Sequence, residues 1–509
     1  MFTPRKGIAA STRVTLLPAV VAALALLTTA CAEDKAPAGP PPPTLDRYYQ
    51  QTLAWGSCDG YQGGAELGAA GLECARVTVP IDYGNPDGDT GRIALSRLRA
   101  AGKRVASLLT NPGGPGAPGL DLPLALAKSP VAERFDLIGM DVRGLGASTP
   151  HVTCRTAAEF ETGQRVLGRT DPLVEIDQIE EENEEYANSC ARRTGLTLLG
   201  HVGTVDVARD MDVVRAALGE QKLTYFGGSY GTRLGSTYAE LFPDRVRAMV
   251  LDAPVDPTTN ISDPVITAAG FQRAFDAYAA DCAKSPDCPL GTDPAKASEK
   301  YRALVKPLIQ QPISTADRRK LDYGAVTTAT IASLYHPASW PGLTRGLTEL
   351  ARGHGEALLG DAGVYEDASS DEVHRAVLCL EEVRVTDRAV ATDIDRRSRT
   401  AAPAFDDGLP GSAAPLDACA FWPVPPTAQP HVPHVAGLPK LVVVAVTGDP
   451  ATPYPGGVSL AKTLGASLIT YEGTQHGAAF EGIACVDEPV LKYLVDLTPP
   501  AEGLRCSKP

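Results

Sequence analysis

The 509-residue chain has no excess of positive charge, since 47 lysines and arginines stand against 61 aspartates and glutamates, a net charge of −14. Binding to a nucleic acid backbone needs clustered positive charge, so this balance argues against a nucleic acid partner. Charged residues make up only 21% of the chain and apolar residues 44%, which is enough to build a large folded core. The 49 glycines and 43 prolines favour a loop-rich protein over a coiled coil or a simple bundle.

Long apolar runs are scarce, and the one that stands out lies at residues 14–30, after three basic residues. It is 17 residues long and is broken by Pro18, whereas a membrane-spanning helix needs about 20 residues. The basic start, the apolar centre and the small residues before Cys31 predict an export signal peptide over residues 1–30. A permanent N-terminal anchor helix is the alternative.

Cys31 ends a stretch, LTTAC, that resembles a bacterial lipobox, in which the cysteine is lipidated and becomes the N-terminus of the mature chain. We therefore expect a lipid anchor on Cys31 that holds the protein at a membrane. Residues 31–44 include four consecutive prolines, which keep this segment extended as a tether. The sequence thus predicts an exported protein of the cell envelope, anchored to the outer face of the cytoplasmic membrane, with release from the membrane as the alternative.

No two cysteines are spaced as Cys-x-x-Cys, and the eight histidines are scattered, so neither a metal nor another cofactor is expected. Apart from Cys31, ten of the 11 cysteines remain, an even number that suits five disulfides in an oxidising compartment. The sequence alone does not fix their connectivity. Pairing each cysteine with its neighbour in the chain would join Cys58–Cys74, Cys154–Cys190, Cys282–Cys288, Cys379–Cys419 and Cys485–Cys506.

Strand and helix patterns alternate through residues 45–257 and return in residues 431–509, which predicts a parallel sheet with helices on both faces. The run LVVVAV at residues 441–446 is continuously apolar, as in a strand buried on both faces. Strands are expected at residues 92–98, 106–110, 135–141, 223–226, 246–251, 441–446 and 466–471, the last of them the final strand, and helices at 173–190, 204–218 and 232–242. Residues 258–430 have few strand signals and helical patterns at 271–282 and 295–310, which predicts a mostly helical insertion.

The segment Gly227-x-Ser229-x-Gly231 follows an apolar strand and precedes a helix. This arrangement is the nucleophile elbow of α/β-hydrolases, in which glycines permit a turn sharp enough to expose the serine hydroxyl at a helix N-terminus. The alternative is a structural serine in a glycine-rich turn. We therefore predict an α/β-hydrolase fold with a mainly parallel sheet and Ser229 as the nucleophile. The large helical insertion would then form a cap between the nucleophile and the catalytic acid.

Two further residues would complete a catalytic triad in the chain order of serine, acid and histidine that this fold uses. Of the eight histidines, only His476 follows the last expected strand, and glycines flank it in GTQHG. Asp449 directly follows residues 441–448, which contain the expected strand, and would orient the imidazole and stabilise its protonated form. An ordinary loop histidine and an aspartate that caps a turn are the alternatives.

Acyl transfer also needs hydrogen-bond donors for the oxyanion of the transition state. One is the backbone N–H of Tyr230, the residue after the nucleophile. The other is expected from the glycine-rich turn NPGGPG at residues 111–116, whose prolines have no N–H, so Gly113 or Gly114 must donate. A phosphate cradle is rejected, because this turn has no Gly-Lys-Ser/Thr and lacks the dinucleotide glycine spacing.

Together these motifs resemble the actinobacterial tripeptidyl aminopeptidases, α/β-hydrolases related to prolyl iminopeptidases, and the lipid-anchored cell-envelope serine proteases of mycobacteria in that group. The matching segments cover most of residues 45–509 and are residues 111–116, 135–148, 204–235, 251–257, 282–291 and 419–423, with the later GDPATP and GTQHG. The resemblance implies an exported serine exopeptidase that cleaves short peptides from free N-termini through an acyl-enzyme. Ala117 and Pro118 replace the glycine and serine that often follow the glycine-rich turn, which points to a reshaped substrate channel or an altered specificity.

An aminopeptidase must also bind the ammonium group of its substrate, and a carboxylate in a partly buried pocket would do so. Glu381 and Glu382, just after Cys379 in the helical insertion, are the candidates, with ordinary surface glutamates as the alternative. A carboxylesterase or lipase with the same triad is a second interpretation of the chain, because the fold does not fix the substrate. A non-catalytic envelope binding protein is a third, and the presence of three catalytic residue types argues against it.

Overall fold

The structure is a computed structural model that describes residues 45–163, 175–315, 320–362, 368–408 and 413–508. Residues 43–509 form one compact unit, distinct from residues 1–42. The expected signal peptide, the lipidation site Cys31 and the tether lie outside the described residues. Within the described ranges, no helix combines the length and the apolar character that crossing a membrane requires.

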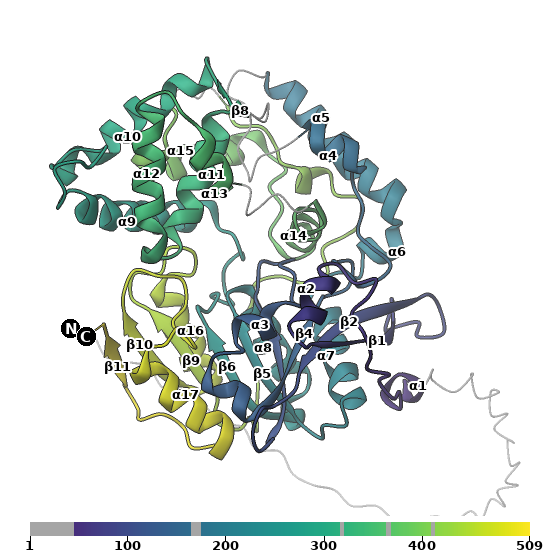
Figure 1. The fold of residues 1–509 in the computed structure, drawn as a ribbon. Coiled ribbons are helices and arrows are strands. Elements are labelled where there is room, and N and C mark those ends of the chain that lie inside the picture. Colours follow the sequence, from purple (N-terminus) through teal and green to yellow (C-terminus); the bar gives the residue numbers. More distant parts are fainter. Residues whose placement is uncertain (1–44, 164–174, 316–319, 363–367, 409–412, 509) are drawn as a thin grey trace, which may run out of the picture. The chain divides into compact units, whose positions relative to one another are not determined.

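A nine-stranded sheet forms the centre of this unit (Figure 1). Its first two pairings are antiparallel and all the others are parallel, which confirms the predicted mainly parallel sheet. In spatial order the strands are β1 (Glu73–Pro80), β2 (Thr90–Leu98), β4 (Phe135–Met140), β3 (Ala106–Asn111), β5 (Leu223–Gly228), β6 (Val246–Asp252), β9 (Val442–Val446), β10 (Ser467–Glu472) and β11 (Arg505–Ser507).

The central strands are buried on both faces, because alternate side chains face two different layers of helices. Leu109 of β3 packs in a cluster with α7 (Thr204–Ala217) and α8 (Tyr230–Leu241). Its neighbour Leu108 packs in another cluster with α17 (Ala484–Asp496). β9, with the sequence VVVAV, is apolar and rich in β-branched residues, and every residue of β3 and β9 is buried. The carboxyl ends of these strands carry the loops described below.

Two edge strands escape the sequence patterns. β1 was not expected, and the prediction that residues 466–471 form the last strand is wrong, since β11 pairs in parallel with β10. β11 has three residues, RCS, of which only Cys506 is buried, so it carries no hydrophobic alternation. The disulfide from Cys506 to Cys485 of α17 ties it to the sheet edge instead.

Residues 258–430 are mostly helical, as expected, and add only one short pair of strands among the described residues. The expected helix at residues 295–310 is shorter, because α10 (Ala297–Val305) gives way at Pro307 to a turn of 3₁₀ helix. The other elements are α9 (Pro264–Cys282), β7 (Ile313–Ser314), β8 (Lys320–Leu321), α11 (Tyr323–Leu334), α12 (Trp340–Leu350), α13 (Glu356–Ala362), α14 (Ala368–Glu381) and α15 (Arg388–Ala401).

The helical insertion divides into two parts by its packing. Phe275, Tyr301 and Leu347 belong to a hydrophobic cluster whose buried members all come from the insertion, with Ala451 of the hydrolase body packed against it. Helix α14 differs, since its buried residues Val373 and Val377 join the cluster of α7, α8 and the sheet. The insertion thus has a core of its own, while one of its helices is part of the hydrolase body.

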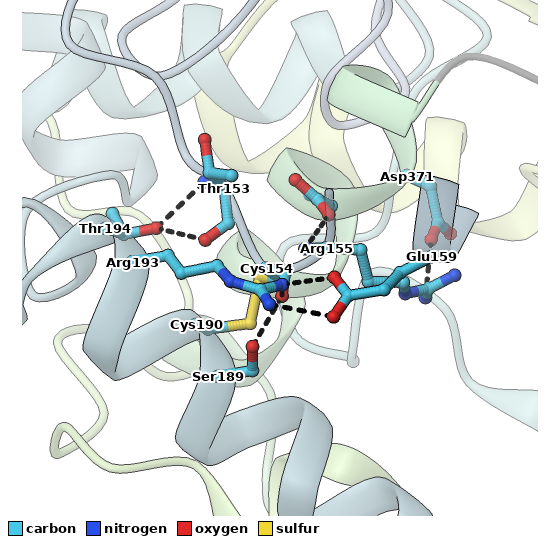
Figure 2. Close-up of a disulfide and its surroundings, with 10 residues drawn as sticks. Thr153, Cys154, Arg155, Glu159, Ser189, Cys190, Arg193, Thr194 and Asp371 are labelled. Carbon is cyan, nitrogen blue, oxygen red and sulfur yellow. Dashed lines mark hydrogen bonds and ion pairs between the residues drawn. A yellow bond between two sulfur atoms is a disulfide. The ribbon is translucent and has the colours of Figure 1, made fainter. Parts of the chain in front are cut away.

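Five disulfides join the described cysteines, and they are the five neighbour pairs written above. Figure 2 shows the one between Cys154, in the loop after β4, and Cys190 of α5 (Ile176–Thr194). Beside it, Ser189 and Arg193 of α5 both donate hydrogen bonds of 2.7 Å to the carbonyl of Cys154. Disulfides persist in oxidising compartments, and their number fits a protein that folds outside the cytosol.

Candidate active site

Ser229 lies at the sharp junction between β5 and α8. Its backbone has φ 54° and ψ −125°, a conformation that residues other than glycine rarely adopt. The flanking glycines permit the turn, since a Cβ on Gly227 would lie 2.5 Å from the carbonyl oxygen of Gly231. Hydrogen bonds keep the serine backbone in this strained conformation, and one of them, of 2.9 Å, runs from the Ser229 N–H to the carbonyl of Asp252.

His476 and Asp449 come from two different loops at the carboxyl end of the sheet and meet directly. The imidazole Nδ1 lies 2.9 Å from Oδ1 and 3.1 Å from Oδ2 of the Asp449 carboxylate, which is buried. This contact fixes a proton on Nδ1 and leaves Nε2 as the free ring nitrogen. Asp449 also accepts the N–H groups of Ala451 and Thr452, each at 2.9 Å, so it orients the histidine and caps its own turn.

The helical insertion contacts the histidine from the other side. The backbone carbonyl of Tyr335, which follows α11, accepts a hydrogen bond of 2.8 Å from the backbone N–H of His476. The tyrosine and imidazole rings meet edge to face with centroids 5.2 Å apart. Burial on its own lowers the pKa of His476, but the charge and hydrogen bond of Asp449, with the charge of Asp252, outweigh burial and raise the pKa.

Asp252, the last residue of β6, connects the serine elbow to the histidine loop. Its carbonyl accepts the N–H of Ser229, and its carboxylate accepts the N–H groups of Ala478 and Ala479 at 3.0 and 3.1 Å. Burial raises the pKa of this carboxyl to about 7. The sequence analysis missed Asp252 as a site residue, although a carboxylate at the end of a central strand, in the matched segment LDAPVDP, was a usable signal.

The Ser229 hydroxyl and His476 share no hydrogen bond among those found within the described ranges. Asp252 nevertheless holds their backbones together, and Gly477 fits closely, since a Cβ there would lie 2.8 Å from Oδ2 of Asp252. In unliganded sites the catalytic hydrogen bonds are often long and tighten when substrate binds. The structure therefore brings the histidine and the acid together and places the serine on the same framework.

Residues 113–116, which we call the glycine turn, lie against this elbow and contain two of the expected oxyanion donors, Gly113 and Gly114. A Cβ on Gly113 would lie 2.8 Å from Cβ of Ser229 and 3.0 Å from the nitrogen of Tyr230. The Gly113 N–H is engaged, because it donates to Oδ1 of Asn111 at 2.9 Å. The N–H groups of Gly114 and Tyr230 have no hydrogen-bond partner among the described residues, so Gly114 is the better candidate of the two glycines.

Glu381 and Glu382, the candidates for binding an ammonium group, differ in their surroundings. Glu381 is only 4% exposed, and its carboxylate accepts both the backbone N–H and the hydroxyl of Thr204 at the start of α7. Glu382 is partly exposed, accepts the N–H of Ser262 at 2.7 Å, and has its pKa raised by burial to about 7. The carboxylate of Glu381 is therefore used in hydrogen bonds inside the fold, and Glu382 is the better candidate for binding an ammonium group.

A serine on a strained strand-to-helix turn, at the carboxyl edge of a mainly parallel sheet that also bears a histidine–carboxylate pair, defines a serine hydrolase. A family model described as the alpha/beta hydrolase fold matches residues 107–483, and the chain belongs to this family.

Three relatives show which serine hydrolases the chain is similar to. The chain is 44% identical over 479 residues to the serine protease Hip1 of Mycobacterium tuberculosis, covering 90% of this chain and 91% of that protein. It is 43% identical over 473 residues to carboxylesterase B of the same species, covering 89% and 90%. It is 32% identical over 476 residues to a tripeptidyl aminopeptidase of Streptomyces lividans, covering 86% and 84%. The resemblance to the tripeptidyl aminopeptidase group is thus confirmed.

Because the pKa of His476 is raised, we expect the rate of labelling by a fluorophosphonate to increase with pH through a midpoint above the usual histidine value of about 6.5. The imidazole accepts the serine proton only when it is neutral, which sets this sign. Asp252→Asn keeps an acceptor for the neighbouring N–H groups but removes the negative charge that Asp252 carries above its pKa of about 7. The midpoint should therefore fall part of the way towards 6.5, while Asp449 still raises it. Stopped-time labelling across pH measures both midpoints.

The exposed Asp244→Asn serves as the control for a change of charge and is expected to leave the midpoint unchanged. A wild-type midpoint at or below 6.5, or equal midpoints in the wild type and Asp252→Asn, would contradict the charge arrangement described here.

Proposed function

We propose that this protein is an exported serine exopeptidase that cleaves short peptides, such as tripeptides, from free N-termini. The observation that carries the proposal is the His476–Asp449 pair held to the Ser229 elbow through Asp252. Relatives named as a serine protease and as a tripeptidyl aminopeptidase, each similar over most of the chain, support the peptidase class.

In the proposed mechanism, Oγ of Ser229 attacks the scissile carbonyl while Nε2 of His476 takes its proton. Asp449 stabilises the imidazolium that forms. The oxyanion of the tetrahedral intermediate accepts the N–H groups of Tyr230 and Gly114. The imidazolium then protonates the leaving amine, an acyl-enzyme remains on Ser229, and a water activated by His476 releases the peptide acid and restores the serine.

Replacing the nucleophile tests this assignment. We expect Ser229→Ala to lose tripeptide release from a free N-terminus and all fluorophosphonate labelling, while its melting temperature stays at or above the wild-type value because alanine removes only the hydroxyl. Release is measured by mass spectrometry on a peptide library and stability by thermal unfolding. Tripeptide release by Ser229→Ala would reject the proposed mechanism.

The relative named carboxylesterase B favours a second candidate, a cell-envelope carboxylesterase or lipase that uses the same residues. Assaying the wild type on acyl esters beside the same peptide library separates the two candidates. Hydrolysis of acyl esters by the wild type, with no cleavage of tripeptide amides, would select the esterase.

We further propose that Glu382 binds the substrate's ammonium group. Its partial exposure and its position directly after α14 support this role. Its raised pKa predicts that the carboxyl is half ionised at about pH 7 and gains its full charge at higher pH. Glu382→Gln is expected to raise KM for free-amine peptides about tenfold, equivalent to ~1.4 kcal/mol, with a smaller change in kcat. The exposed Glu181→Gln is the charge-matched control.

An N-acetylated ester of the same acyl group has no ammonium, so its KM is expected to stay the same in Glu382→Gln. Equal increases in KM for the free-amine and acetylated substrates would show that Glu382 shapes the pocket without binding the amine.

The cell-envelope location is also a proposal, supported by the five disulfides and by the sequence around Cys31. We propose that Cys31 carries a lipid that anchors the mature chain to the outer face of the membrane. Cys31→Ser is expected to abolish incorporation of labelled fatty acid and to move the protein from the membrane fraction to the soluble fraction. Retained lipid label in this variant would contradict the assignment.

A further inference from the structure

One backbone hydrogen bond of 3.2 Å, from the N–H of Ala117 to the carbonyl of Gly113, closes the glycine turn, but among the described residues none holds the N–H of Gly114. Gly113, Gly114 and Gly116 all have positive φ angles, and glycine has more accessible backbone conformations than any other residue. Donors that stabilise an oxyanion must be aimed before the charge develops, since reorienting them during the reaction costs activation energy. The turn therefore needs contacts from outside to fix the N–H of Gly114.

Helix α14 supplies such contacts. Its Ser370 hydroxyl donates to the carbonyl of Gly116 at 2.7 Å, and Nδ1 of His374 lies 3.0 Å from the carbonyl of Pro115. A carbonyl oxygen only accepts, so the imidazole donates from Nδ1. A Cβ on Gly116 would lie 2.8 Å from the carbonyl oxygen of Ser370 and 3.0 Å from the nitrogen of His374, so the two backbones pack directly against each other.

The turn also contacts the serine elbow, against which Gly113 packs. Gly114 thus lies between two fixed neighbours: Gly113 on the elbow and the Pro115–Gly116 carbonyls on α14. The same helix also reaches the other proposed donor residue. Its last residue, Glu381, accepts the hydroxyl of Thr204, whose oxygen lies 2.6 Å from the phenol oxygen of Tyr230.

Helix α14 is in turn fixed to the body of the protein. Glu372 accepts the backbone N–H of Arg155 at 2.7 Å, and Asp371 forms an ion pair with the Arg155 guanidinium at 3.3 Å. Figure 2 shows Arg155 and Asp371 beside the Cys154–Cys190 disulfide, which holds this loop to α5. Farther along, Cys379 is joined to Cys419. These ties make the helix a rigid support.

We propose that α14 acts as the positioning element of the oxyanion site and that His374, through its hydrogen bond to Pro115, is its main positioning residue. The proposal rests on the proposed function, because it needs Gly114 to serve as an oxyanion donor. Burial lowers the pKa of His374, so the ring is neutral at neutral pH and carries its single proton on Nδ1. The sequence analysis did not single out His374, because it does not follow the last expected strand.

Two substitutions of the histidine separate the hydrogen bond from the packing. Asparagine places an N–H₂ group near the position of Nδ1 and can donate to Pro115, whereas leucine fills similar space and donates nothing. We expect His374→Leu to lower kcat by about 10- to 100-fold, less than the 10²- to 10³-fold loss typical when an oxyanion donor is removed, with KM within about twofold. His374→Asn should retain kcat within about threefold of the wild type.

A transition-state analogue provides a readout that a purely structural role would not move. A tripeptide aldehyde forms an oxyanion on the nucleophile, so its inhibition constant should weaken in His374→Leu by the same factor as kcat/KM, while inhibition by the product tripeptide is unchanged. His354→Leu, an exposed histidine of the insertion, is the control. Ser370→Ala removes only the contact to Gly116 and should lower kcat by about three- to tenfold.

Three results would overturn the proposal. One is kcat within twofold of the wild type in both His374→Leu and Ser370→Ala. Another is equal impairment of the Asn and Leu variants at wild-type melting temperature. The third is weaker inhibition by aldehyde and product alike, which would assign the helix to substrate binding. Loss of turnover in Ser229→Ala alongside any of these would leave the proposed function standing, whereas an active Ser229→Ala would reject that function itself.

Discussion

The backbones of the serine elbow, the glycine turn and the end of β6 approach one another closely at Ser229. The active site depends on this close approach. The serine keeps a left-handed backbone that costs on the order of 1–3 kcal/mol, and hydrogen bonds to Asp252 and from Thr232 hold it there. Only glycine can occupy the facing position 113. Burial of the apolar central strands stabilises the fold and offsets the free-energy cost of this strained backbone. The local chemistry therefore depends on a large apolar sheet.

Local patterns were enough to predict the central strands and the elbow, because buried parallel strands are apolar and nucleophile turns require glycine. They failed for β11, which has three residues and is tied by a disulfide and by pairing with β10. Asp252 and His374 were missed for a related reason. Each acts through backbone groups of segments distant in sequence, Asp252 on the histidine loop and His374 on the glycine turn, and single-chain patterns do not report such pairings.

Position in the chain does not decide where every helix of the insertion packs. By sequence, α14 lies within residues 258–430, but its apolar face joins the sheet's own cluster through Val373 and Val377. Chain position and packing thus disagree, and packing decides the helix's role. The segment from α9 to α13 is the part whose apolar side chains turn mainly to one another.

The separate hydrophobic cluster of that segment has an evolutionary consequence. Changes in contacting residues are coupled, whereas changes in well-separated clusters add independently. Natural selection can therefore remodel the helices around Phe275 and Leu347 with few compensating mutations elsewhere, except where Tyr335 and Gly270 meet the loops of His476 and Asp449. Diversification of this kind would let descendants of one ancestral enzyme acquire new preferences while inheriting the same reaction chemistry unchanged.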